Sequence, residues 1–200
     1  KIKIIITTNT TLHDLYKDGL QRDQFLPFIS IIENYSIQKE LQIKDDYRTK
    51  NNEKLQQIFF PLNEKTSFRI NQKFREFTRS INKESKIVTT KGRNFVINNF
   101  YSGVARFKFN DLCDNNLGAE DYINISNFCK HIFIEQIPKF NDENSNQQLR
   151  FITMIDIFYE KKIRLTLSIE ENLDNLSSSN KHSEVFKRTI SRMFEMTKSP

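Results

Sequence analysis

A basic stretch in the second quarter of the sequence combines residue types and spacing that could do chemistry. Residues 51–100 hold 10 basic and 4 acidic residues and account for the whole net charge of +6. Apolar residues recur there at helical spacing, at Ile70, Phe74, Phe77 and Ile81. This pattern predicts an amphipathic helix over residues 66–80, with a basic face formed by Arg69, Lys73, Arg75 and Arg79. Such a face can follow a nucleic-acid backbone, or it can be an ordinary solvated surface.

A second candidate is Asn9, which follows a run of β-branched residues at the start of the sequence. The run predicts a buried parallel strand over residues 1–7. Open α/β sheets hold their ligands at the carboxyl ends of the strands, and the Asn9 amide would lie at such an end. The alternative is a turn role, because Asn is common where strands end.

Several other kinds of site are excluded by missing or poorly spaced residues. A phosphate-binding loop of the form G-x-x-x-x-G-K-[ST] needs two glycines five residues apart, and the 4 glycines of this sequence stand alone. No apolar run approaches the roughly 18 residues of a membrane helix. Cys113 and Cys129 lack the spacing of a zinc site or a disulfide scaffold, and we expect both to be buried thiols.

Two further features are interpreted as structural. The segment 132–136 is similar to a magnesium-binding strand, but Gln136 cannot replace the carboxylate that such a site needs. We therefore expect a buried strand that ends at an edge glutamate, Glu135. The histidines have no partner pattern typical of a base or a metal ligand, and each is expected at the surface or in a turn: His13, His131 and His182.

Strand and helix signals alternate along the chain, which predicts an α/β fold. The expected strands are 1–7, 37–43, 87–90, 95–99, 104–109, 132–137 and 165–169. The expected helices are 12–17, 27–35, 66–80, 119–130, 147–162 and 186–196. Residues 49–57 are polar and form the expected linker, residues 176–183 form a Ser-rich loop, and Gly92 and Gly103 stand at turn positions.

Residues 15–29, which read LYKDGLQRDQFLPFI, resemble the signature of the ZapE and AFG-like ATPases, a family of AAA+ P-loop enzymes. Further similar segments follow in the family's order and near its spacing, so the resemblance covers essentially the whole chain. These segments are 46–48, 107–113, 121–123, 137–138, 150–159 and 186–196. The resemblance implies the C-terminal portion of such an enzyme, with the Walker A loop and the Walker B carboxylates preceding the first strand.

The implied fold class is α/β, with the end of an AAA+ core sheet followed by an α+β C-terminal domain of the lid type. Residues 1–48 would form the part of the core that carries the sensor 1 strand and the arginine finger, and residues 49–200 would form the lid-type domain.

By resemblance, two residues of the first part take catalytic roles. Asn9 matches sensor 1, which orients the water that attacks the γ-phosphate, and Arg22 matches the arginine finger that reaches a neighbouring subunit's site. The alternative for Arg22 is a local ion pair with Asp18 or Asp23. The family usually has a proline a few residues beyond the sensor asparagine, and residues 10–14 contain none, which loosens the expected loop geometry.

The sensor 2 arginine, which contacts the γ-phosphate from the lid side, has three candidates in the cofactor-binding role. They are Arg150 at the head of a long predicted helix, and Arg188 and Arg192, which lie four residues apart on one face of the last helix. The alternative for Arg192 is a surface pair with Glu195. The sequence alone does not choose among them.

The resemblance implies an ATPase that uses ATP and Mg²⁺ and remodels a protein partner, in bacterial cell division or in mitochondrial protein quality control. It further implies a homo-oligomeric ring and a location in the bacterial cytoplasm or in mitochondria, and it is compatible with peripheral membrane association. A nucleic-acid partner is not expected, because the basic helix face is interpreted first as a solvated surface. The 200 residues alone are not expected to hydrolyse ATP. Two alternatives remain, a basic nucleic-acid-binding module and an inactive structural adaptor.

Overall fold

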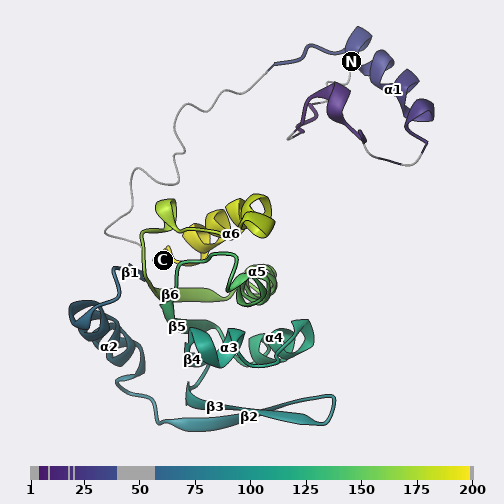
Figure 1. Cartoon of the computed structure of the whole chain (residues 1–200). Helices are drawn as coiled ribbons and strands as arrows, with labels where there is room; N and C mark the ends of the chain where they lie inside the picture. The colour runs from purple at the N-terminus through teal and green to yellow at the C-terminus, as the bar shows by residue number, and fades with distance from the viewer. Residues whose placement is uncertain (1–4, 9, 18, 20, 40–56, 199–200) are drawn as a thin grey trace. The chain divides into compact units, whose positions relative to one another are not determined.

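The chain divides into two compact units, residues 1–45 and 46–200, in a computed structural model (Figure 1). The structure describes residues 5–8, 10–17, 19, 21–39 and 57–198. The boundary predicted between residues 48 and 49 lies outside the described residues and stays a prediction.

The first unit contains a short 3-10 helix, η1 (Leu12–Asp14), and one long helix, α1 (Arg22–Tyr35). Helix α1 begins five residues earlier than predicted, so Pro27 lies inside the helix rather than at its first position. Gln21, just before α1, has a left-handed φ of 60° and its carbonyl accepts from the Gln24 amide at 3.0 Å. This backbone turn, which the residue types alone do not announce, sets the start of the helix.

The strand predicted over residues 1–7 is wrong for residues 5–7, which have no regular structure. Ile5 and Ile6 expose 91% and 71% of their surface. A β-branched run forms a strand only beside a pairing partner, and the described residues of this unit include no strand. Residues 37–39 of the predicted strand 37–43 are also irregular, and the rest of that segment lies outside the described residues, as does Asn9.

The second unit is built on a six-stranded sheet with the order β1-β6-β5-β4-β3-β2. Its strands are β1 (Ile58–Phe59), β2 (Glu84–Thr90), β3 (Arg93–Tyr101), β4 (Val104–Lys108), β5 (His131–Ile137) and β6 (Arg164–Ile169). Its helices are α2 (Glu64–Thr78), α3 (Phe109–Cys113), α4 (Ala119–Ser126), α5 (Ser145–Glu160) and α6 (Ser183–Met196), with 3-10 turns at η2 (Leu173–Asn175) and η3 (Asn180–His182). Strands β1, β6, β5 and β4 are parallel, whereas β3 pairs antiparallel with both β4 and β2.

Helices cover both faces of this sheet, with α2 on one side and α3 to α6 on the other (Figure 1). Alternation along β5 divides the core between these layers. Ile132 and Ile134 join the large cluster beneath α4, α5 and α6. Phe133 points the other way and packs edge-on against Phe74 of α2, with ring centroids 5.0 Å apart. The mixed α/β architecture predicted for the chain is confirmed here, because β4, β5 and β6 are parallel strands joined by helices.

Most predicted elements of the second unit are present within a few residues of their expected bounds. Gly92 and Gly103 lie in the two hairpin turns at φ values of 78° and 91°, a region that favours glycine. The short elements β1 and α3 were not predicted. Gln57, the last residue of the predicted linker, is buried, and its backbone N–H donates to the Thr197 carbonyl at 2.9 Å. The linker prediction is therefore wrong at that residue.

No helix that the structure describes is both long and apolar enough to cross a lipid bilayer.

Candidate functional site

Arg22 is the first residue of α1, and its guanidinium folds back over the preceding loop. Nη2 donates to the His13 carbonyl at 2.6 Å and Nη1 donates to the Lys17 carbonyl at 3.2 Å. The ion pair weighed with Asp23 is not formed, and Asp18 lies outside the described residues. An arginine carries five N–H donors. These two contacts fix the guanidinium and leave other donors for an outside acceptor.

The loop under Arg22 is held by a small polar cluster. The Thr11 hydroxyl donates to one carboxylate oxygen of Asp14 at 2.8 Å, and the Lys17 ammonium pairs with the other at 3.1 Å. The hydrogen bond from Thr11, followed by that from Lys17, lowers the pKa of Asp14. The cluster therefore orders the segment whose carbonyl groups hold Arg22. The roles of Asn9 and Arg22 in catalysis stay predictions.

Arg188 and Arg192, on α6, meet at Asp156 of α5. Arg188 Nη2 lies 2.9 Å from Asp156 Oδ2, and Arg192 Nη1 donates to Asp156 Oδ1. Both carboxylate oxygens are thus occupied by arginines one helical turn apart, as their spacing predicts. The Arg192 guanidinium also lies 4.8 Å from the centre of the Tyr159 ring. This arrangement joins α6 to α5, and the Arg192 side chain is only 20% exposed, whereas that of Arg188 is 59% exposed.

Arg192 also borders a hollow of about 620 Å³ at the ends of α5 and α6. Its lining residues are Tyr159, Glu160, Lys162, Ile163, Arg164, Arg192, Glu195, Met196 and Lys198. The Tyr159 hydroxyl donates to Glu195 at 2.6 Å. The lining holds the acidic Glu160 and Glu195 beside its basic side chains. The hollow is therefore mixed in charge rather than a dedicated anion site.

Arg150 is not part of that cluster. Its Nη1 donates to the Cys113 carbonyl at 2.9 Å and so ties α5 to the end of α3. The structure thus brings Arg188 and Arg192 together and places Arg150 on a different element. Which of the three acts as sensor 2 stays a prediction.

The two thiols are buried as predicted, and burial sets their acidity. Desolvation raises the pKa of Cys129 to about 12 and raises that of Cys113 further still. Both thiols are thus buried and weakly acidic, as is typical of structural cysteines.

The segment 132–136 is a buried strand, as expected. Glu135 is engaged on both oxygens by the guanidinium of Arg106, a bidentate pair at the edge of the core. Arg106 also donates to Asn71 of α2 at 2.6 Å. The pair therefore fastens α2 to the sheet.

The prediction for His131 is wrong. Its side chain is buried between α2 and the sheet, with its ring centre 4.5 Å from that of Phe77. Its Nε2 lies 2.8 Å from the Thr166 hydroxyl, which in turn donates to Gln57. Because the single Thr166 proton goes to Gln57, His131 must donate from Nε2. His131 is thus a satisfied core histidine rather than a surface residue.

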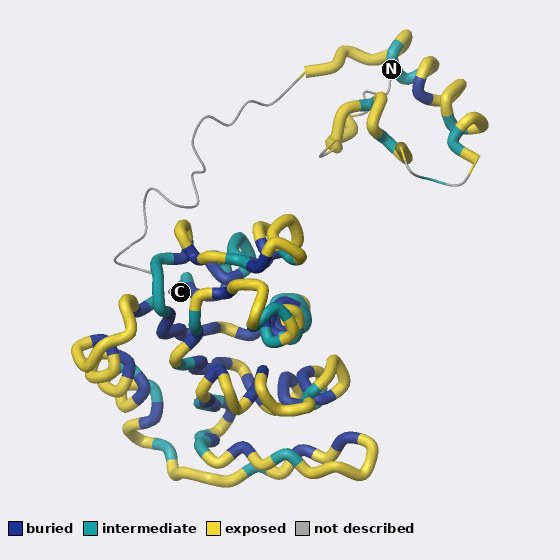
Figure 2. Tube along the Cα trace, in the orientation of Figure 1, coloured by how far each residue is buried: buried dark blue, intermediate teal, exposed yellow. Residues whose placement is uncertain are grey.

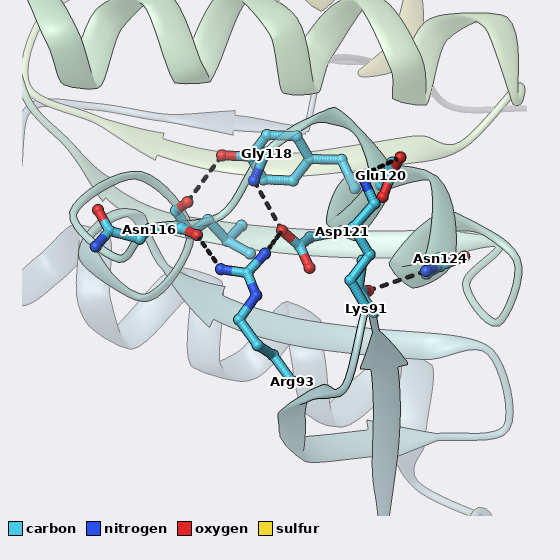
Figure 3. Close-up of polar contacts among 10 residues, drawn as sticks. Lys91, Arg93, Asn116, Gly118, Glu120, Asp121 and Asn124 are labelled. Atoms are coloured by element: carbon cyan, nitrogen blue, oxygen red, sulfur yellow. Dashed lines mark hydrogen bonds and ion pairs between the residues drawn. The ribbon is translucent and has the colours of Figure 1, made fainter.

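A polar clasp joins the β2–β3 hairpin to α4 (Figure 3). Arg93 donates to Asp121 Oδ2 at 3.1 Å and to the Asn116 carbonyl at 2.8 Å. The same Asp121 oxygen accepts from the Gly118 amide at 2.8 Å and so caps the first turn of α4. One buried carboxylate therefore starts a helix and anchors a hairpin.

Replacing Asp121 with alanine should lower the free energy of unfolding by about 2 kcal/mol, because the cap and a partly buried charge pair are lost together. Glu120→Ala is the matched control. The Glu120 carboxylate pairs with Lys91 at 2.8 Å with both side chains more than half exposed, so its loss should cost less than about 0.5 kcal/mol. Urea unfolding of both variants measures the difference, and equal losses would contradict the central role of Asp121.

Three acceptors could not be identified from the sequence. They are Asp156 for Arg188 and Arg192, Asp121 for Arg93, and Glu135 for Arg106. Asp156 and Asp121 lie inside segments that carry the family resemblance, which is the only signal that pointed to them. Their partners lie 28 to 36 residues away in sequence, beyond any local spacing rule. Within the described residues, no group of three or more acidic, histidine or cysteine side chains could hold a metal ion.

Comparison with known proteins covers the whole chain. A family model described as AFG1-like ATPase matches residues 1–200. Lactation elevated protein 1 homolog B of Danio rerio is 28% identical over 178 residues, 88% of this chain and 35% of that protein. Cell division protein ZapE of Escherichia coli K12 is 24% identical over 195 residues, 98% of this chain and 52% of that protein. No solved structure matches the chain.

A protein of Schizosaccharomyces pombe is 29% identical over 174 residues, 84% of this chain and 38% of its own length. The chain thus spans between about a third and a half of the length of these relatives. The match of the family model to every residue shows that the chain belongs to the AFG1-like ATPase family.

Proposed function

We propose that this chain is part of an AAA+ ATPase that couples ATP hydrolysis to the remodelling of a protein partner. The observation that carries the proposal is the family match over residues 1–200. One relative is named a cell division protein, which favours a protein partner of that kind if the chain is bacterial. If the chain is mitochondrial, the corresponding role is protein quality control.

The chain's own contribution to catalysis would be the Arg22 guanidinium. Phosphoryl transfer develops charge on the equatorial oxygens of the transferred group, and a planar fork of donors suits those oxygens. The loop carbonyls of His13 and Lys17 orient Arg22 before any ligand arrives. Acting from one subunit on the nucleotide of the next, Arg22 would make catalysis depend on a homo-oligomeric ring.

The residues of this chain do not by themselves fit an ATP–magnesium complex. The sequence has no phosphate-binding loop, and the described residues offer arginine donors but no carboxylate cluster for the metal ion. We propose that the phosphate loop and the metal ligands lie outside these 200 residues, while Arg22 and one of Arg150, Arg188 and Arg192 contact phosphate oxygens.

An ATPase assay on two proteins tests this function. The full-length protein should release phosphate from ATP, and the 200-residue chain alone should not, because nothing in it can surround the β- and γ-phosphates. Turnover by the isolated chain would contradict the proposed location of the phosphate loop. A full-length protein without turnover would instead support an inactive adaptor.

A further inference from the structure

The outward face of α2 combines four exposed side chains in one row. Phe68, Gln72, Arg75 and Arg79 recur at intervals of four, three and four residues, which places them on a single stripe along the helix. Thr66, Ile70, Phe74 and Thr78 form the opposite, buried stripe. Figure 2 shows this division, with the outer side of α2 exposed and its inner side buried. The row is about 16 Å long at 1.5 Å per residue.

The charges of this row are not neutralised from within the molecule. Residues 64–83 hold six basic and two acidic residues. Of the two acids, Glu76 pairs with Lys73 at 3.1 Å. Neither Arg75 nor Arg79 has an ion pair with a carboxylate among the described residues. By contrast, Arg188 and Arg192 share the Asp156 carboxylate. The row therefore carries two arginines whose charge is not neutralised by an ion pair among the described residues.

The spacing of the two arginines and the aromatic and amide side chains beside them indicate which class of anion fits the row. Phe68 exposes 69% of its surface, more than any other phenylalanine that the structure describes. Beside Arg75 and Arg79 the surface is hollowed, with a volume of about 410 Å³ and a lining that also includes Gln72, Thr78 and Glu76, the acid that pairs with Lys73. Arg75 and Arg79 lie about 6 Å apart along the helix axis, a spacing that two successive phosphates of an extended strand can match. Gln72 adds an amide that can bond a base edge or a sugar.

We propose that this face of α2 binds single-stranded nucleic acid. Arg75 and Arg79 contact successive phosphates, and an unpaired base stacks on Phe68, the combination by which proteins hold single strands without a closed pocket. A duplex keeps its bases stacked on one another, so Phe68 would have nothing to stack on. An acidic polypeptide could satisfy the arginines but would make no use of the exposed ring. The proposal rests on α2 alone and is independent of the proposed ATPase function.

Fluorescence anisotropy with labelled oligodeoxythymidine and oligouridine of about 20 nucleotides tests the proposal on the 200-residue chain. Binding should weaken steeply between about 50 and about 200 mM salt. The double variant Arg75→Ala/Arg79→Ala should lower the slope of log K against log salt by about 1.4, the value for two phosphate contacts on a single strand. Phe68→Ala should weaken binding by about fivefold or more at an unchanged slope.

Lys181→Ala/Lys187→Ala is the matched control, because it removes the same net charge from η3 and α6 while leaving α2 intact. It should keep the salt slope of the unmodified chain. All substituted side chains are exposed, and circular dichroism checks that each variant folds. The preference between the DNA and RNA strands identifies the natural ligand.

Four results would overturn the proposal. They are no binding at low salt, competition by polyglutamate or by a duplex as strong as that by a single strand, the same slope in both double variants, and full affinity in Phe68→Ala.

Discussion

Arg22→Ala in the proposed longer protein, which would add the phosphate-binding loop, should lower kcat for ATP hydrolysis by about 10³-fold or more, with little change in nucleotide affinity. The reason is that an arginine finger acts on charge that develops in the transition state, and such residues contribute roughly 10³ to 10⁵ in rate. Arg22→Lys should recover only a small part of the loss, since an ammonium group cannot replace the planar fork of donors. Steady-state phosphate release and equilibrium nucleotide binding separate the two quantities.

The structural contribution of Arg22 needs its own control, because its guanidinium also bonds to the His13 and Lys17 carbonyls. Thr11→Ala provides it: this variant removes the hydroxyl that bonds Asp14 and loosens the same loop while keeping the guanidinium. Thr11→Ala should retain most of the turnover. Mixing Arg22→Ala subunits with subunits that keep Arg22 but lack a working phosphate loop should restore hydrolysis if the finger acts between subunits. Unchanged kcat in Arg22→Ala would remove the finger assignment.

The stability of the second unit should fall by an extra amount of about 3 kcal/mol as pH falls from 7 to 4, because of His131. Burial, followed by the charges of Arg164 and Lys73, lowers the pKa of His131 to about 4. The unfolded chain binds this proton near pH 6.5, whereas the folded chain does not. Protonation therefore favours the unfolded state between these two values, and the stabilising contribution is present above about pH 6.5 and lost as pH falls toward 4.

His131→Gln tests this effect, since glutamine can still donate a hydrogen bond to Thr166 but does not titrate. Urea unfolding at several pH values should show a shallower acid loss in His131→Gln than in the unmodified chain. His182→Gln, at the less buried turn η3, is the control and should retain the steep loss. Parallel pH profiles for the unmodified chain and His131→Gln would show that His131 does not carry the proton linkage.

Local patterns predicted the second unit well where one element could be recognised from its own residues. The period of four in α2 places Ile70 and Phe74 inward, and the β-branched and aromatic residues of β5 mark a buried strand. The same reasoning misplaced His131, because its partners Thr166 and Gln57 come from distant parts of the chain. A lone histidine carries no local signal of such a network.

In the first unit, residues 5–7 have strand-like composition but no strand beside them, and composition alone cannot supply a pairing partner. At the candidate site, too, local spacing could be read from the sequence but contacts between distant residues could not. The spacing of Arg188 and Arg192 predicted a shared face, whereas Asp156, which the two arginines share, is set by the packing of α5 against α6.

The backbone hydrogen bond between Gln57 and Thr197 brings the two ends of residues 57–198 side by side. Because Gln57 and Thr197 lie one hydrogen bond apart, a short linker could join the two ends without any rearrangement of the sheet, as in a circular permutation. Domains whose ends lie close together also tolerate insertion into other chains, because the flanking segments enter and leave at one place.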